Sequence, residues 1–245
     1  MKLETGALAA LAIAAASCGI RANPPGRPSA ESQAPRPDQV ADFALLYGSN
    51  CAGCHGSEGK GGAAVGLGDP VYLAIADDAT IRSVISEGIP GTAMPAFAQQ
   101  SGGMLTKQQV DAIVRGIRAR WEKPDILGGI KPPPYAAEEP GDSERGAKVY
   151  AVYCSSCHGV EGRGSEQAGS IVDSSFLALV SDQGLRTTVI VGRPAIGAPD
   201  WRGNVRGKMM TNEEISDVVA WLAAQRSAVP GQPYSSSQLT AAGGL

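Results

Sequence analysis

Two copies of one five-residue pattern contain most of the thiols and all of the imidazoles in this chain. The pattern is C-x-x-C-H, and it occurs as C-A-G-C-H at residues 51–55 and as C-S-S-C-H at residues 154–158. Four of the five cysteines and both histidines belong to it. Any chemistry that needs sulfur and imidazole together must therefore be built at these two places.

The spacing within C-x-x-C-H is typical of covalent attachment of a c-type haem. Two thiols three positions apart on one helical turn can add to the two vinyl groups of one porphyrin edge. The histidine that follows can then bind the iron as an axial ligand. The sequence thus predicts two covalently attached haem c groups, held by Cys51, Cys54 and His55, and by Cys154, Cys157 and His158.

Other uses of paired cysteines are a disulfide, a redox-active C-x-x-C and one half of a zinc site. A redox motif of the thioredoxin type is expected between strands and helices, and no segment shows the period-two alternation of a strand. A zinc site needs further ligands, and both histidines are already part of the two patterns. Haem attachment is therefore the favoured interpretation.

Length and composition limit what surrounds the two motifs. A chain of 245 residues is long enough for one or two domains. It contains 32 glycines and 17 prolines but only three phenylalanines, which favours small, loop-rich domains whose cores a cofactor completes. The formal net charge of -3 and the absence of a basic stripe argue against nucleic acid as a partner.

The chain contains an internal repeat of about 85 residues. A displacement of 103 to 105 residues aligns the two halves, including the tyrosine four positions before each first cysteine and the G-x-E-G-[KR]-G segment after each histidine. I-R-S-V-I-S-E-G-I-P aligns with L-R-T-T-V-I-V-G-R-P further along. The two halves are therefore expected to have the same fold.

Each repeat shows helical patterning throughout. A capping box, T-x-x-Q or T-x-x-E, precedes the last apolar periodic segment of each repeat and begins at Thr106 or Thr211. No segment alternates as a strand does, so both repeats are predicted to be all-α. The other expected helices are Val40–Tyr47 and Ser143–Tyr153 before the motifs, and Thr80–Glu87 and Leu185–Val191 in the middle of the repeats.

The N-terminus has the outline of an export signal, with Lys2 before an apolar run that is too short to span a bilayer. The segment ending in Ser-Cys18-Gly resembles the lipobox of bacterial lipoproteins, although Ala15 replaces the usual leucine and Glu4 reduces the positive charge. Lipidation of Cys18 is expected, and the alternative is a plain signal peptide with an incidental cysteine. The expected segments are a signal peptide at 1–17, a lipid-anchored flexible tether at 18–38, domains at 39–123 and 142–227, a Pro/Gly-rich linker at 124–141, and a flexible tail at 228–245.

With these motifs in place, each repeat resembles a class I cytochrome c domain, and the pair resembles the tandem diheme cytochromes c of bacterial periplasms. The resemblance covers residues 38–226. It implies that a proline carbonyl accepts the Nδ1–H of the histidine ligand, a role that Pro70 fits in the first domain. The second domain has Val172 and Asp173 there, so another carbonyl must serve. Arg82 and Arg186 are expected either to reach haem propionates or to lie on solvated helix faces.

The resemblance also implies a methionine ligand on the other side of each iron. In the first domain G-T-A-M-P-A-F matches the family's Met-Pro loop, which favours Met94 over Met104. The aligned residue in the second domain is Ala198, which has no donor atom. Met210 is the favoured replacement, because it aligns with an inward-facing position before the N-cap. The remaining alternatives are Met209, a weak ligand such as Lys208, or an open iron.

These residues favour a diheme electron carrier rather than an enzyme. It would pass single electrons between a membrane respiratory or photosynthetic complex and another redox partner, from the periplasmic side of a bacterial membrane. The alternative is a diheme peroxidase-like or gas-binding protein with an open second haem. No other histidine is available as an acid or base near the second site, which argues against the peroxidase.

Overall fold

The computed structural model describes residues 34–228. The predicted signal peptide, Cys18, most of the predicted tether and all but the first residue of the predicted tail lie outside the described residues. The chain divides into two units, Met1–Gln39 and Val40–Leu245. The first contains a short 3-10 helix, η3 (Pro37–Gln39), and the second contains all the elements that follow.

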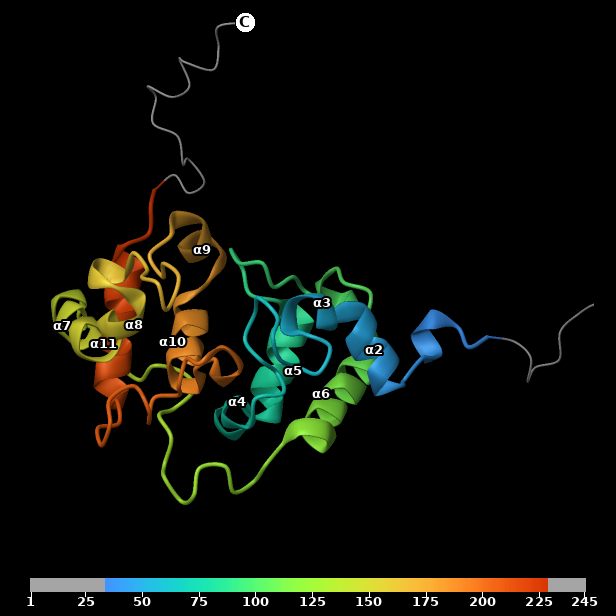
Figure 1. Ribbon diagram of the computed structural model, residues 1–245. Helices are drawn as coiled ribbons and strands as arrows, with labels where there is room; N and C mark the ends of the chain where they lie inside the picture. Colours follow the sequence, from blue (N-terminus) through green and yellow to red (C-terminus); the bar gives the residue numbers. More distant parts are fainter. Residues whose placement is uncertain (1–33, 229–245) are drawn as a thin grey trace, which may run out of the picture. The chain divides into compact units, whose positions relative to one another are not determined.

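The first repeat folds into helices joined by long loops (Figure 1). Among the described residues, β-structure is limited to isolated bridges, so the all-α prediction is confirmed. None of the helices between residues 34 and 228 has the length and apolarity needed to cross a membrane. In chain order the elements are α2 (Phe43–Asn50), α3 (Ala52–His55), α4 (Pro70–Ile75), α5 (Asp78–Glu87), η4 (Gln99–Ser101) and α6 (Lys107–Trp121).

The second repeat has the same order of α-helices, with two 3-10 turns where the first repeat has one (Figure 1). Its first long helix, α7, has the predicted bounds, and the middle and last long helices follow at the expected places. The elements are α7 (Ser143–Tyr153), α8 (Ser155–His158), η5 (Val160–Gly162), α9 (Ser174–Leu179), α10 (Asp182–Val191), η6 (Pro194–Ile196) and α11 (Asn212–Ala224).

Polar caps set where the helices begin, and they correct three predicted bounds. Asp42 accepts a hydrogen bond from the backbone N–H of Leu45, so α2 begins at Phe43 rather than at residue 40. Asp77 and Ser181 cap α5 and α10 in the same way, so these helices begin two and three residues earlier than predicted. For α5 and α10 the prediction followed apolar periodicity, which does not detect a polar first turn. For α2 the apolar Val40 extended the pattern beyond the capped start of the helix. Both capping boxes, at Thr106 and Thr211, are present as predicted.

In each repeat the first long helix packs against the last. Tyr47 of α2 lies 5.0 Å from Trp121 of α6 between ring centroids, and Tyr150 of α7 stacks at 4.3 Å on Trp221 of α11. A glycine permits each close approach: a Cβ on Gly116 of α6 would fall 2.1 Å from the Phe43 ring, and one on Gly146 of α7 would fall 2.0 Å from the Asp217 carbonyl oxygen. The two repeats therefore place this glycine on opposite helices.

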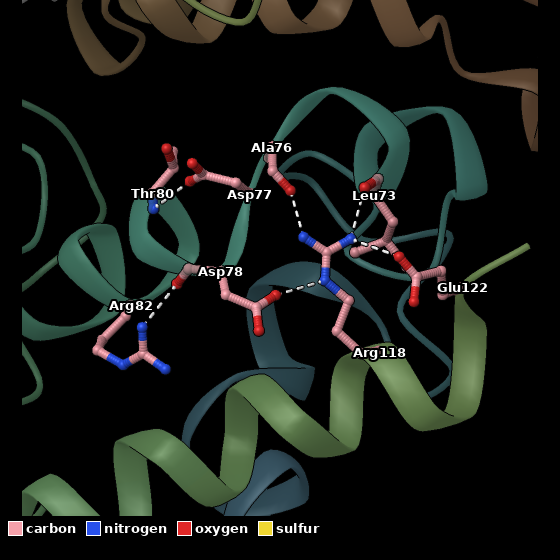
Figure 2. A network of polar contacts seen from close by, with 8 residues as sticks. All are labelled: Leu73, Ala76, Asp77, Asp78, Thr80, Arg82, Arg118 and Glu122. Carbon is pink, nitrogen blue, oxygen red and sulfur yellow. Dashed lines mark hydrogen bonds and ion pairs between the residues drawn. The ribbon is translucent and has the colours of Figure 1, made fainter. Parts of the chain in front are cut away.

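Arg118 ties the connection between α4 and α5 to α6 (Figure 2). Its guanidinium donates to the carbonyl oxygens of Leu73 and Ala76 near the end of α4. It also donates to the carboxylate of Asp78 at 2.7 Å and to that of Glu122 at 3.1 Å. The last carbonyls of a helix have no partners within it, so this arginine supplies the donors that they need. This role of Arg118 was not predicted from the sequence.

Candidate haem-binding sites

Each C-x-x-C-H motif begins at the junction between a long helix and a single helical turn. Cys51 caps α2, Cys154 caps α7, and the rest of each motif forms α3 or α8. All four motif cysteines are free thiols. Each motif therefore offers two unpaired sulfur atoms and one imidazole within one short helix, which is the donor set that covalent haem attachment requires.

A backbone carbonyl orients the histidine of each motif. The Nδ1 atom of His55 lies 2.7 Å from the carbonyl oxygen of Val65, and that of His158 lies 3.0 Å from the carbonyl oxygen of Gly169. An imidazole held in this way donates through Nδ1 and keeps its Nε2 lone pair for a metal. Val65 and Gly169 are 104 residues apart, so they are equivalent positions of the repeat.

The prediction that Pro70 accepts the His55 hydrogen bond is wrong. Pro70 opens α4, where its fixed φ suits the first helical position, and Asp69 caps this helix through the N–H of Val71. The His55 imidazole instead contacts the carbonyl oxygen of Val65, five residues before Pro70, in the loop that leads to α4. The prediction that another carbonyl replaces the missing proline in the second domain is confirmed, and that carbonyl belongs to Gly169.

Burial favours the neutral forms of three motif side chains, those of His55, Cys51 and Cys154. It lowers the pKa of His55, which is 7% exposed, and so favours the neutral imidazole that binds metals. Burial, with a smaller contribution from the neighbouring cysteine, raises the pKa of Cys51 and Cys154 to about 11. A redox-active C-x-x-C has the opposite property, a lowered thiol pKa. The electrostatics therefore favour attachment over thiol–disulfide exchange.

The repeated tyrosines hold the chain just after each histidine. The hydroxyl of Tyr47 donates to the carbonyl oxygen of Gly56 at 2.9 Å, and the hydroxyl of Tyr150 donates to that of Gly159 at 2.6 Å. Gly56 and Gly159 have φ values of 84° and 75°, where glycine is strongly preferred. The sequence showed that the tyrosines repeat, but it did not show what they bind.

Met94 lies in a loop held close to the end of α5. Its carbonyl oxygen accepts from the N–H of Ile89 at 3.0 Å, and its own N–H donates to the hydroxyl of Thr92 at 3.2 Å. The Met94 side chain is half-buried, whereas Met104 is 82% exposed. Of the two methionines considered for the first iron, Met94 is the one placed among other protein groups.

The second domain has the same loop with Ala198 in place of the methionine. The N–H of Arg193 donates to the carbonyl oxygen of Ala198 at 2.9 Å, as Ile89 does to Met94 in the first domain. Met210 is 3% exposed and Met209 is 47% exposed. The amide of Asn204 donates to the Met210 sulfur at 3.8 Å, which orients the thioether.

Two further side chains that the sequence left open are engaged elsewhere. The Lys208 ammonium pairs with Glu214 at 3.3 Å and lies 4.9 Å from the centroid of the Tyr153 ring. Arg186 is 2% exposed, so the expectation that it lies on a solvated helix face is wrong. Its partners include two backbone carbonyls of the linker.

The two halves of the chain match two different family models. Residues 38–115 match the family model described as cytochrome C oxidase, cbb3-type, subunit III, and residues 143–226 match the model described as cytochrome c. These two ranges include one C-x-x-C-H motif each. Their separate matches agree with the duplication that the sequence shows.

Several curated relatives resemble both halves together. The Cbb3-type cytochrome c oxidase subunit FixPc of Rhizobium leguminosarum bv. viciae is 26% identical over 68% of this chain and 55% of its own length. The Cbb3-type cytochrome c oxidase subunit CcoP of Cereibacter sphaeroides is 26% identical over 73% of this chain and 58% of its own length. The cytochrome bc1 complex cytochrome c subunit of Mycobacterium tuberculosis is 22% identical over 76% of this chain and 64% of its own length.

The chain spans little more than half the length of the cbb3-type relatives. Motifs, geometry and family models therefore agree that the chain contains two cytochrome c-type domains in tandem, whose cofactors are two covalently attached haem c groups.

Proposed function

We propose that this protein carries single electrons between a membrane respiratory or photosynthetic complex and another redox partner. The observation that carries the proposal is the repeated site: two free thiols and a histidine oriented through Nδ1, found once in each domain. A carrier needs little more than attachment, axial ligands and a dry environment. Relatives of the chain are subunits of cbb3-type oxidases and of a bc1 complex, which favours a respiratory complex.

The residue roles in this proposal follow the repeat. Each haem supplies one-electron chemistry between ferric and ferrous iron, and the chain fixes and encloses it. A histidine–methionine pair leaves no open position on the iron and raises its potential, which suits electron transfer. The proposed attachment residues are Cys51, Cys54, Cys154 and Cys157, and the proposed iron ligands are His55, Met94, His158 and Met210, with Met209 as the alternative to Met210.

Burial and orientation support Met210 as the second ligand of the second haem. Its N–H donates to the carbonyl oxygen of Trp201 at 3.0 Å, so its backbone is tied to the loop that lacks a methionine. In the first domain Leu105 makes the equivalent contact with Phe97, where a purely apolar side chain suffices. A thioether at this buried position adds a soft donor that leucine does not have.

We also propose that the protein works on the periplasmic side of a bacterial membrane and is anchored there by lipidated Cys18. The support is the apolar N-terminal run that ends at this cysteine, followed by a segment rich in proline, serine and charge. An extended tether of this composition would let the two domains reach a partner above the membrane surface. Mass spectrometry of the purified membrane form tests the anchor.

The spectrum of the purified protein tests the electron-carrier proposal. We expect two low-spin haems, a methionine–iron charge-transfer band in the oxidised form, and no binding of carbon monoxide by the reduced form. A high-spin haem that binds carbon monoxide stoichiometrically would favour the peroxidase-like or gas-binding alternative instead.

Met210→Leu and Met209→Leu form a matched pair for the second ligand. Leucine conserves most of the volume of methionine, so both variants should fold. We expect Met210→Leu to bind about one carbon monoxide per protein, because one of the two irons loses its ligand. Met209→Leu should remain unreactive. The opposite pattern would assign the ligand to Met209, and carbon monoxide binding by neither variant would exclude both methionines.

A further inference from the structure

Arg186 and Arg82 are equivalent residues of the repeat with different surroundings. The Arg82 side chain is 40% exposed and pairs with Asp111 at 2.7 Å on the surface of the first domain. Arg186, on α10, is 2% exposed and is one of the largest fully buried side chains in the described part of the chain. One position of the repeat therefore carries a surface ion pair in one domain and a buried cation in the other.

A single difference in sequence explains why Arg186 is free to take other partners. The position equivalent to Asp111 is Ser216, so a hydroxyl stands where the first domain has a carboxylate. The Arg186 guanidinium donates to the Ser216 hydroxyl at 3.2 Å and to the side-chain oxygen of Asn212. These two neutral oxygens leave other N–H groups of the guanidinium in need of acceptors.

The linker between the domains supplies those acceptors. Arg186 donates to the carbonyl oxygen of Pro134 at 2.8 Å and to that of Tyr135 at 3.1 Å. Gln183, one turn earlier on α10, donates to the same Tyr135 oxygen at 2.8 Å. Asn212 adds a hydrogen bond to the Glu138 carboxylate at 3.0 Å. This end of the linker is thus fixed to α10 and to the start of α11.

The other end of the linker is fixed to the same domain. Arg202 donates to the carbonyl oxygen of Ile126 at 3.2 Å and is itself held by Asp200 at 2.6 Å. Ile126, Leu127 and Tyr135 are also partly buried against an apolar cluster whose members come from both repeats. Gly128-Gly129, the pair that composition alone would suggest as a hinge, lies between the two attachment points.

The contacts of Arg186 make the domain and the linker depend on each other. A buried guanidinium without acceptors is strongly unfavourable, because the charge loses its hydration and gains nothing in return. The carbonyls of Pro134 and Tyr135 restore hydrogen bonds to it. Release of the linker would expose the guanidinium or leave it without these acceptors. The hydrogen bonds to Arg186 therefore stabilise the docked linker in addition to its apolar contacts.

We propose that residues 126–138 form a strap that stays docked on the second domain through Arg186, and that articulation of the chain between the domains is confined to residues 122–125. The strap removes the flexibility that a Pro/Gly-rich linker would otherwise provide. Its proline content supports this role, since a chain with few accessible conformations loses little entropy on docking.

Proteolysis and hydrogen exchange of the haem-loaded full chain test the strap, with Arg82→Gln as the matched control for Arg186→Gln. A brief chymotrypsin pulse reports cleavage after Tyr135. We expect cleavage and exchange in residues 126–138 to be at least about tenfold faster in Arg186→Gln than in the wild-type protein, because a charge-assisted hydrogen bond is lost. Arg82→Gln should match the wild-type protein. Equal rates in all three proteins would overturn the proposal.

Exchange in α7 and α11, measured in the same samples, distinguishes local undocking from global unfolding. If Arg186→Gln loses protection from exchange in these helices as well, Gln183→Leu becomes the variant that tests the strap. It removes one hydrogen bond to Tyr135 and keeps the buried arginine. This variant should show faster exchange in residues 126–138 with α7 and α11 unchanged. An unchanged strap in a folded Gln183→Leu protein, together with rapid cleavage of the wild-type linker, would contradict docking.

Discussion

The two histidines receive the same contact in both domains although different residues provide it. Val65 and Gly169 share neither size nor shape, but each offers a backbone carbonyl at the same position of the repeat. A contact made by the backbone places little demand on the side chain that carries it. For this reason residue identity could not locate the acceptor, and the expectation that it would be Pro70 failed.

Asp217 is the residue at which charge and burial give a clear prediction of stability. It is 3% exposed and accepts from both the Nε and an NH2 of Arg145 at 2.8 Å and from the N–H of Asp142 at 2.7 Å. These bonds, the one from the Arg145 side chain above all, hold the pKa of Asp217 below the usual 3.8. Asp217→Asn should therefore lower the free energy of unfolding at pH 7 by about 2 kcal/mol.

The same pKa fixes the pH range of that effect. Because the folded-state pKa is depressed, the ionised Asp217 contributes its full stability above the unfolded value of 3.8 and loses it as the pH falls through the folded value. Urea unfolding of wild type and Asp217→Asn should therefore differ at pH 7 and converge in strong acid. A difference that persists unchanged in acid would show that the asparagine acts through packing instead.

At the scale of residues, the sequence could predict groups that act through their own side chains. The motif cysteines and histidines and the capping threonines belong to this class, because local spacing alone defines what they do. Arg118 and Arg186 could not be predicted, because the carbonyls that they bind lie 42 to 52 residues away in sequence. The aligned repeats show that Ser216 stands where the first repeat has Asp111. The consequence for Arg186 could not be predicted, because it depends on the linker carbonyls that lie next to the guanidinium in the fold.

At the scale of elements, the glycines that end α5 and α10 determine where the following loop can lie. Gly88 and Gly192 both have a φ of 68°. A Cβ on Gly88 would fall 2.7 Å from the carbonyl oxygen of Met94, and one on Gly192 would fall 2.2 Å from that of Pro199. The end of the helix is therefore packed directly under the loop that carries Met94 or its counterpart Ala198.

Gly88→Ala and Gly91→Ala separate this packing from backbone strain. Gly91 has a φ of 72° but open space around its missing Cβ, so its substitution adds strain of about 1–2 kcal/mol and no clash. Gly88 combines its positive φ with a ψ of -167°, a conformation essentially restricted to glycine, so Gly88→Ala adds at least this strain and also displaces the loop. We expect both to reduce the free energy of unfolding in urea, with Gly88→Ala affected more.

The methionine–iron charge-transfer band supplies the second readout for this pair. It should weaken in Gly88→Ala, because the Met94 loop moves, and persist in Gly91→Ala. An unchanged band in Gly88→Ala would mean either that the loop tolerates the methyl group or that Met94 is not a ligand. Unfolding data on the same samples separate these outcomes, since a tolerated methyl group would leave the two variants equally stable.

At this scale the long helices could be predicted, with errors mainly at their first turns, whereas the short helices α4 and α9 were not predicted. The bounds of α7 and the two capping boxes needed only local patterns. The first turns of α5 and α10 are polar, so their apolar period begins late. The glycine at each crossing of the terminal helices could not be assigned, because it lies on α6 in one domain and on α7 in the other.

At the scale of the whole molecule, each domain contains a complete attachment motif and its own pair of packed terminal helices. We therefore expect a variant with Cys154→Ser and Cys157→Ser to carry one haem per chain, held by the first domain. The variant with Cys51→Ser and Cys54→Ser should carry one haem in the second domain. Haem content per chain, measured by the pyridine haemochrome assay, checks both. A chain that loses both haems on either change would show that attachment in one domain depends on the other.

The hydrogen bonds of Arg186 have a consequence for what counts as the second domain. A boundary drawn where helical patterning resumes would begin that domain at Asp142, because α7 starts directly after it. A fragment cut there would leave behind the carbonyls of Pro134 and Tyr135 and turn a buried guanidinium toward water. With the proposed strap, the second folding unit is longer than the repeat that specifies it, because it includes the stretch of chain that precedes Asp142.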